Sequence, residues 1–226
     1  RTWRSVHRII ARLNINAMRR RQIVDATIAV MARRGWNDTS IDEITKEANV
    51  SRGLVSYHFK DKADLLSAVL ARCQEVYEDA VSSAAAQTDD PVERIRLVVR
   101  ASLDQITADP VNYEVFLHFT ASARTDPVLG EQIRRLWRGY QMRSALAIRA
   151  AQRAGVVRAD IDPGAAAVGG IGAVTGLALQ YLLEPGSFPI EEAARQTEEM
   201  LMSYLTGTPA VPAQSEPAAE SPVSTE

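Results

Sequence analysis

The chain has one cysteine, three histidines and no run in which apolar and polar residues alternate convincingly. Cys73 has no second cysteine to pair with, which favours a reducing cytoplasm and predicts a small packing residue. His7, His58 and His118 are far apart and lack metal-ligand spacing, so we expect no metal and no cofactor. Without alternation there is no sign of strands, and an all-α fold is expected.

Catalytic patterns are missing as well. No glycine-rich phosphate loop and no Ser/His/Asp arrangement stands out, so we do not expect an enzyme. An all-α enzyme is kept as the alternative from a different class. The amino end is basic, but no apolar stretch follows it, so no secretory signal is expected.

Charge is divided unevenly along the 226 residues. Residues 1–62 hold 13 Lys and Arg against 6 Asp and Glu, whereas the remainder holds 13 against 22. A basic first quarter joined to an acidic remainder indicates a polyanion-binding domain attached to a body that does not bind the polyanion. Within residues 1–16 there is no acid. We expect either a basic arm that reaches DNA or a disordered tail that adds only non-specific attraction, and part of it has enough apolar residues to pack as a helix.

The segment that begins at Thr39 predicts two short helices joined by a tight turn. Ser40, with Glu43 three residues later, forms a capping box for the first helix. Asn49 tolerates the left-handed backbone that the turn needs, and Ser51 can cap a second helix. This pattern is a helix-turn-helix, whose second helix lies in a DNA major groove.

Three further helix boundaries follow from the residues around this motif. A helix from Met18 to Arg34 precedes it, with Ile23, Ala26 and Val30 inward and with Gly35 at its end. The second helix of the motif runs from Arg52 to His58. Asp61 can cap a long helix from Lys62 to about Ala86, which joins the head to the rest.

The residues from Arg20 to Leu66 closely resemble the DNA-binding domain of the TetR (tetracycline-repressor) family of bacterial regulators. Asn49 and Ser56 stand where the family usually has Gly and often has Tyr. Near the other end of the chain, Leu177 to Gln180 resembles betaine-repressor-like C-terminal domains. The features that carry the head's resemblance are Gly35-Trp36, Thr39-Ser40, Ala48, Val50-Ser51, Gly53, Tyr57-His58-Phe59, Lys62 and Leu65-Leu66.

The resemblance implies which residues bind DNA. Arg52 and Tyr57 are the candidates for base edges, because Arg pairs with guanine and an aromatic ring can touch a thymine methyl group. Thr39 and Ser40 stand at a helix start, where they bind a phosphate, act only as caps, or do both. His58 is a candidate for a DNA contact and equally for local packing. The expected DNA-binding set is Thr39, Ser40, Arg52, Gly53, Leu54, Ser56, Tyr57, His58 and Lys62, with Val55 and Phe59 in the core.

Four later helices share one start signal, an Asp followed by a Pro, which suits the N-cap and the first helical position. A last helix is expected from Pro189 to Leu205. The tail, residues 207–226, has four Pro and no Lys or Arg and is expected to be disordered. The four start signals are Asp90-Pro91, Asp109-Pro110, Asp126-Pro127 and Asp162-Pro163.

The segment from Pro163 to Leu183 has no charged residue over 21 positions, a length that could span a bilayer. Its content is largely Gly and Ala, which favours a buried interface helix and no membrane partner. The resemblance implies that this helix and the last one pair with a second copy in a four-helix bundle. The expected interface residues are Gly169, Ala173, Gly176, Leu177, Gln180, Thr197, Met200, Leu201 and Tyr204.

The resemblance also implies a small-molecule pocket between the helices of the body. At helical spacing, such side chains are more often ordinary core than a ligand site. The candidate lining residues are Phe116, His118, Phe119, Trp137, Tyr140, Met142 and Tyr181.

Together these observations predict a basic arm (1–16), a three-helix DNA-binding head (17–64), a helical regulatory and dimerisation body (65–206) and a tail (207–226). The expected function is that of a cytoplasmic, homodimeric transcriptional repressor. It binds a palindromic operator on double-stranded DNA and is released by a small-molecule inducer. The alternative within DNA binding is an activator, or a regulator controlled by a partner protein without an inducer.

Overall fold

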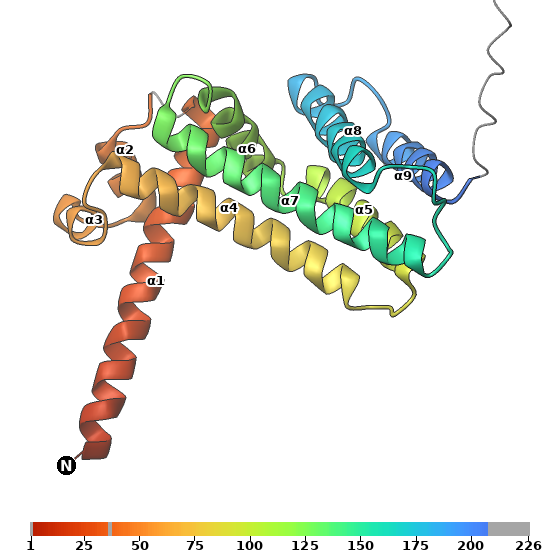
Figure 1. Ribbon diagram of the computed structural model, residues 1–226. Helices are drawn as coiled ribbons and strands as arrows, with labels where there is room; N and C mark the ends of the chain where they lie inside the picture. Colours follow the sequence, from red (N-terminus) through yellow and green to blue (C-terminus); the bar gives the residue numbers. More distant parts are fainter. Residues whose placement is uncertain (1, 36–37, 208–226) are drawn as a thin grey trace, which may run out of the picture.

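The computed structural model describes residues 2–35 and 38–207, without the side chains of residues 2–13, and its regular structure in these ranges is entirely α-helical. The all-α prediction is therefore confirmed. Figure 1 shows the helices, which are α1 (Thr2–Arg34), α2 (Ile41–Ala48), α3 (Arg52–His58), α4 (Lys62–Ala85), α5 (Pro91–Ala108), α6 (Pro110–Ser122), α7 (Pro127–Arg153), α8 (Pro163–Leu183) and α9 (Ile190–Thr206).

The predicted Asp-Pro starts begin α5, α6, α7 and α8. In each of them the Asp side chain accepts a hydrogen bond from a backbone N–H of the first turn, and the Pro occupies the start of the helix. Asp90, for example, accepts from the N–H of Glu93 at 2.7 Å. The start of α9 differs, because Pro189 offers no side-chain cap and two acids, Glu191 and Glu192, lie in the first turn instead.

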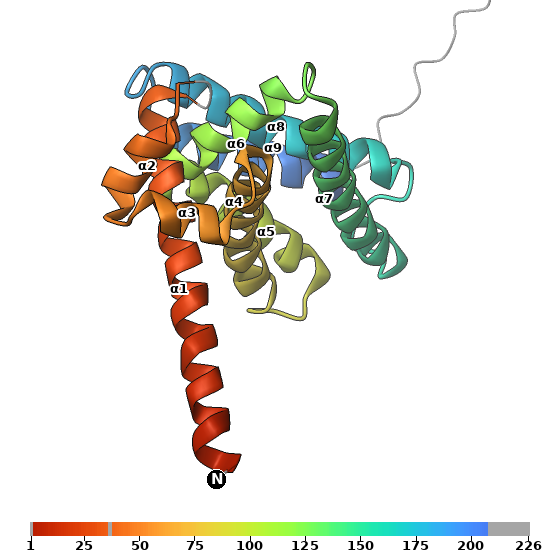
Figure 2. The same ribbon diagram turned by 90° about the vertical axis from the view of Figure 1, so that its left-hand side faces the viewer.

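Helix α1 is longer than the sequence predicted. We expected it to begin at Met18, and it begins at Thr2. No Pro or Gly lies between Thr2 and Arg34, so nothing in this stretch interrupts the helix. Gly35, at φ +75°, ends it as predicted, and its N–H donates to the carbonyl oxygen of Met31 at 2.7 Å. At 1.5 Å per residue the helix is about 50 Å long, and its first half projects away from the rest of the molecule (Figure 1 and Figure 2).

One hydrophobic core spans the helix-turn-helix and the near half of the body. Ile23 of α1, Ile44 of α2, Leu65 of α4 and Phe119 of α6 are all almost fully buried in it. Two smaller clusters pack α5, α8 and α9 together at the far end, one of them with part of α7. Helix α6 and the head therefore contribute to the same packed core.

An ion pair with a buried carboxylate joins α9 to α5. The side chain of Glu198 is only 6% exposed and accepts two hydrogen bonds from Arg100, both at 2.8 Å, and one from Arg96 at 3.3 Å. Burial raises the pKa of this carboxyl, but the hydrogen bonds from Arg100 and Arg96 outweigh it and leave the pKa below its ordinary value. The carboxylate therefore stays charged in the folded protein.

We expect this carboxylate to make stability depend on acid. Because the pKa of Glu198 is lowered on folding, its contribution is present above the ordinary pKa of 4.5 and is lost as the pH falls through the folded value. Glu198→Gln should lower the free energy of unfolding at pH 7 by about 1.5–3 kcal/mol and flatten its decline below about pH 4.5. Urea unfolding at fixed protein concentration measures both, with Glu114→Gln, an exposed acid of α6, as control. If the free energy of unfolding of Glu198→Gln fell as steeply with acid as that of the wild type, other carboxylates would cause the pH dependence.

Candidate nucleic-acid interface

The α2–turn–α3 unit has the local geometry that the sequence predicted. The Ser40 hydroxyl accepts from the N–H of Glu43 at 3.3 Å, and the Glu43 carboxylate accepts from the N–H of Ser40 at 3.3 Å, so both halves of the capping box are present. Asn49 lies in the left-handed region at φ 49°. The Ser51 hydroxyl then caps α3 by accepting from the N–H of Leu54 at 3.2 Å. The helix-turn-helix is therefore held by its own short-range hydrogen bonds.

Helix α3 has one buried face and one exposed face. Val55 and Phe59 are 3% and 4% exposed and pack into the core, as expected. Tyr57 is 66% exposed, which is unusual for so large an aromatic side chain. Of the remaining DNA-binding candidates on this helix, Arg52, Gly53 and Ser56 are exposed, and Leu54 and His58 are half-buried.

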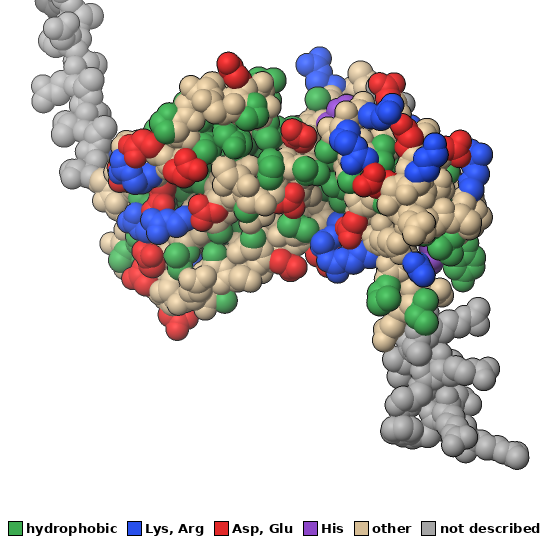
Figure 3. All heavy atoms as spheres, turned by 180° about the vertical axis from the view of Figure 1, so that it is seen from behind, with side chains coloured by type: hydrophobic (Ala, Val, Ile, Leu, Met, Phe, Trp, Pro, Cys, Tyr) green, Lys and Arg blue, Asp and Glu red, His purple; other side chains and the backbone are tan. Residues whose placement is uncertain are grey.

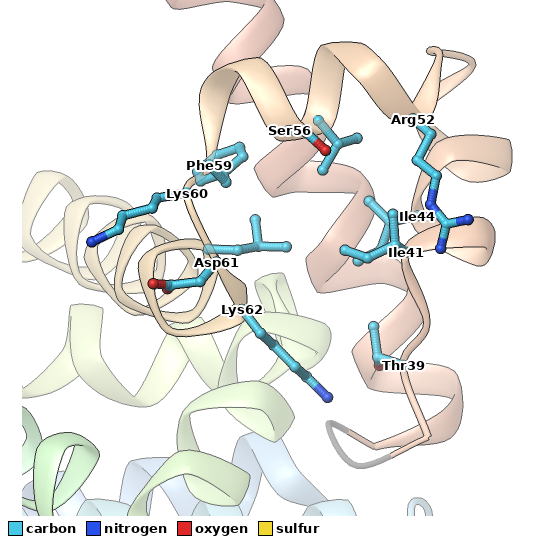
Figure 4. A pocket seen from close by; sticks show the side chains of 11 residues that line it. Thr39, Ile41, Ile44, Arg52, Ser56, Phe59, Lys60, Asp61 and Lys62 are labelled. Carbon is cyan, nitrogen blue, oxygen red and sulfur yellow. The ribbon is translucent and has the colours of Figure 1, made fainter.

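A hollow of about 230 Å³ lies between α3 and the starts of α2 and α4 (Figure 4). Thr39, Arg52, Ser56 and Lys62, which the sequence marked as separate candidates, meet around it. Lys60 also lines it and was not among the predicted residues, although its position beside the cap Asp61 and next to Lys62 was a visible signal. Asp61 also lines the hollow, and Arg52 faces Asp42 at 3.6 Å, so the charges that favour an anion here are those of Lys60 and Lys62.

The hydroxyl groups before α2 serve the local fold. Thr39 is 6% exposed, and its hydroxyl donates to the carbonyl oxygen of Gly35 at 2.8 Å. Ser40 is the N-cap. A phosphate at this position would therefore meet the free backbone N–H groups of the first turn rather than the Thr39 hydroxyl proton.

His58 is held as a neutral packing group. Burial, and next the nearby charge of Arg20, lower its pKa. Its Nε2 atom is buried without a hydrogen-bond partner, and its ring packs edge-on against Tyr57 at 5.0 Å between centroids. In the free subunit this geometry favours the packing interpretation of His58.

Helix α8 leaves much of its surface uncovered in the subunit. It is the one helix of the described residues that is long and apolar enough to cross a membrane, and only 17% of its most apolar window is buried. A Cβ added at Gly169 or at Gly176 would meet no atom within 4 Å. Hydrophobic side chains show over the area of α8 and α9 when the molecule is seen from behind (Figure 3). Of the interface candidates, Gly169, Gln180, Met200 and Tyr204 are exposed, and Ala173, Gly176, Leu177, Thr197 and Leu201 are half-buried.

Three of the predicted ligand-site residues come together in the body. Phe116 lies 5.6 Å from Trp137, and Trp137 lies 6.4 Å from Tyr140, between ring centroids. Two tyrosines that the sequence did not single out for this site, Tyr77 and Tyr113, extend this cluster by ring contacts at 5.1 and 6.5 Å. Burial raises the pKa of all three tyrosines, so their hydroxyls are neutral.

The other four ligand-site candidates lie elsewhere. Phe119 is fully buried in the core that the head shares, and Met142 is 61% exposed on α7. Tyr181 packs against Phe188 near the end of α8. His118 reaches the end of α1, where its ring carbon would lie 3.8 Å from a Cβ at Gly35.

Metal-binding groups and reactive thiols are absent from the part of the chain that is described. No cluster of three or more His, Cys, Asp or Glu side chains occurs there. Cys73 is 2% exposed, and burial raises the pKa of its thiol to about 12, so it stays protonated. The cysteine therefore packs in the core, as predicted.

A helix-turn-helix with an exposed reading face, joined by a long helix to an all-helical body, defines a DNA-binding transcriptional regulator. Residues 23–69 match the family described as bacterial regulatory proteins of the tetR family, and residues 91–206 match the BetI-type transcriptional repressor C-terminal family. The chain thus belongs to the TetR family and has a BetI-type repressor body. It is a transcriptional regulator and not an enzyme.

Relatives and solved structures agree with this assignment. The HTH-type transcriptional regulator BetI of Cronobacter sakazakii is 30% identical over 201 residues, which cover 87% of this chain and 95% of that protein. A TetR-family regulator from Rhodococcus is 26% identical with a TM-score of 0.70, over 84% of this chain and 99% of that one. A transcriptional regulator from Saccharomonospora viridis, solved in complex with choline, shares the fold at a TM-score of 0.76 and 22% identity, over 85% and 100% of the two chains.

Proposed function

We propose that the protein is a homodimeric repressor in which each copy places α3 in the major groove of one half of a palindromic operator. The observation that carries this proposal is the exposed face of α3, where Tyr57 is 66% exposed and Arg52 lines the hollow together with Lys60 and Lys62. One short helix reads only a few base pairs, so useful specificity needs two heads on a two-fold site.

Each DNA-binding candidate takes a role that its position allows. Arg52 reads guanine, and Tyr57 touches a thymine methyl group. Gly53 lets the start of α3 approach the DNA closely, with Ser56 beside it. Lys62 and the N–H groups that follow Thr39 and Ser40 bind phosphates. Leu54 contributes from the edge of the reading face, and His58 packs against the Tyr57 ring at 5.0 Å between centroids.

The second partner is another copy of the chain. In this proposal α8 and α9 pack against the same helices of the partner, through the nine interface candidates named above. The uncharged α8 face, with free space above Gly169 and Gly176, supports this, since helices approach closely where side chains are small. It also accounts for the exposed apolar surface, which a monomer rarely keeps.

We place the head at residues 17–64 and the regulatory body at residues 65–206, with α4 crossing the boundary. The basic first half of α1, which includes residues 2–16 of the expected arm, adds attraction to phosphates. The expected tail lies beyond the described residues, apart from Gly207. The protein acts in the cytoplasm, where the single Cys73 stays reduced.

Lys62→Ala tests the phosphate role. Affinity should fall for all DNA sequences alike, and the slope of log K against log salt should flatten by about one unit, because one phosphate contact is lost. Fluorescence anisotropy at several salt concentrations measures the slope. Arg138→Ala removes an exposed cation on α7 and should leave the slope unchanged. If the slope of Lys62→Ala matches that of the wild type, Lys62 does not bind a phosphate.

The proposed inducer is a small organic cation that binds among the aromatic rings of the body. Cations bind over aromatic faces, and quaternary ammonium groups are recognised by clusters of such rings. The cluster of Tyr77, Tyr113, Phe116, Trp137 and Tyr140 supports this chemistry. The guanidinium of Arg143 already lies 5.1 Å above the Tyr140 ring. The choline bound by the Saccharomonospora regulator of the same fold makes choline the first compound to test.

The remaining candidates take part less directly in this proposal. His118 and Phe119 lie on the side of α6 that faces α1, where they pass a movement of α6 to the head. In this proposal Met142 on α7 and Tyr181 on α8 lie on the route by which the ligand enters the aromatic cluster.

One titration tests the proposed function as a whole. The protein is added to labelled DNA from upstream of its own gene, and choline is then added to the complex. We expect two chains per duplex, a preference over scrambled DNA, and release by choline. Equal binding to upstream and scrambled DNA at low ionic strength would overturn the operator proposal. A complex that does not dissociate when choline is added would overturn this choice of inducer.

A further inference from the structure

An acidic side chain stands next to the main base-reading candidate. Arg52 is the first residue of α3, and Asp42 lies in the first turn of α2. The Arg52 Nη1 atom is 3.6 Å from the Asp42 Oδ1 atom, and the two side chains are 69% and 66% exposed. Figure 4 shows Arg52 reaching from α3 toward the start of α2. A negative charge on a DNA-facing surface weakens attraction to phosphates, so it calls for a physical reason.

Asp42 is not needed to cap α2. Ser40 and Glu43 form the capping box, and Glu43 also pairs with Arg34 at 2.9 Å. The Asp42 side chain instead points to Arg52, whose cation is otherwise unfavourable at the first position of a helix.

We propose that Asp42 is a specificity-determining residue that holds Arg52 for guanine and keeps it from phosphates. This inference rests on the proposed function, in which α3 reads the operator. A guanidinium has five N–H donors in a planar fork, so Arg52 can face Asp42 with one edge and still offer another to guanine O6 and N7. Those two acceptors are neutral, and Asp42 does not repel them.

A phosphate at the same place behaves differently. It carries a full negative charge, and a phosphate bound by Arg52 would lie within a few ångströms of the Asp42 carboxylate, where like charges repel strongly. Asp42 therefore weakens the contact of Arg52 with a phosphate, which every DNA sequence provides. It leaves unchanged the contact of Arg52 with guanine, which only the right sequence provides. Discrimination by repelling the wrong partner is a general route to specificity.

Asp42→Asn tests the proposal, because it keeps the size of the side chain and removes its charge. The operator-to-random affinity ratio should fall about fivefold, within the range expected for perturbing one arginine–guanine contact. Binding to random DNA should strengthen, and its salt slope should steepen by about one unit as Arg52 is freed for a phosphate. Glu47→Gln removes the same charge from the same helix, where Glu47 pairs with Arg33 at 2.6 Å, and should leave the ratio unchanged.

A double-mutant cycle separates positioning from general repulsion. In an Arg52→Ala background, Asp42→Asn should no longer change the ratio. An unchanged ratio in the single variant, or the same fall with Arg52 absent, would overturn the proposal. The operator-to-random affinity ratio of the wild type separates failure of this proposal from failure of the proposed function. A ratio near one would overturn both. A high ratio that stays the same in Asp42→Asn would overturn this proposal alone.

Discussion

Gly176→Glu is expected to give a folded monomer that binds operator DNA about 100-fold more weakly than the wild type, since two linked heads gain about 10²–10⁴-fold over one. Gly176 is half-buried on α8, and a side chain added there meets no atom of its own subunit within 4 Å. Replacing a helical Gly also favours the helix slightly, so the subunit itself should not be destabilised. The introduced carboxylate weakens dimerisation only if the α8 helix of a second copy packs on this face, because the charge would then be buried without a partner.

Gly139→Glu is the matched control for this variant. Gly139 is a helical glycine on α7, outside the proposed interface, and a Cβ there meets only the end of the flexible Arg143 side chain at 3.5 Å. Sedimentation and operator titration should show a wild-type dimer. If Gly176→Glu remained dimeric with full operator affinity, α8 would not be the contact between copies.

Tyr57→Ala should reduce the affinity for the operator about tenfold and leave the affinity for random DNA nearly unchanged. Loss of one base contact costs about 1–3 kcal/mol, and a thymine methyl group is available only at the right sequence. Tyr57 is 66% exposed, so its removal leaves the core around Val55 and Phe59 intact. Competition titrations with operator and scrambled duplexes measure the two affinities.

Tyr57→Phe separates the ring from its hydroxyl. It keeps the apolar face that would touch a methyl group and should retain most of the specificity. A fall in both affinities by the same factor in Tyr57→Ala would instead assign this residue to the DNA backbone.

The helix boundaries that the sequence predicted well are those set by short-range hydrogen bonds. Ser40, Ser51 and Asp61 each cap a helix by accepting a hydrogen bond from the N–H of the residue three positions later. A cap acts within one turn, so its residues are visible together in the sequence. The predicted start of α1 at Met18 was wrong. No residue before Met18 interrupts the helix, so no local signal marks a boundary there.

The candidate site was predicted in part. The sequence pointed to Arg52, Tyr57 and Lys62 one at a time. It did not show that Lys60 completes the hollow, nor that Asp42 faces Arg52 at 3.6 Å. These arrangements depend on the angle between α2, α3 and α4, which the shared core fixes through contacts between distant residues.

The sequence by itself determined the class of the molecule: its helices, their caps, the helix-turn-helix and the basic head. These follow from charge and from interactions within a single turn or helix, which the order of residues states directly. Tertiary structure alone decided which side chains meet: the five aromatic rings of the body, the buried Glu198 between two arginines, and the uncovered face of α8. Such contacts join residues that are far apart in the chain, and only the packing of the core brings them together.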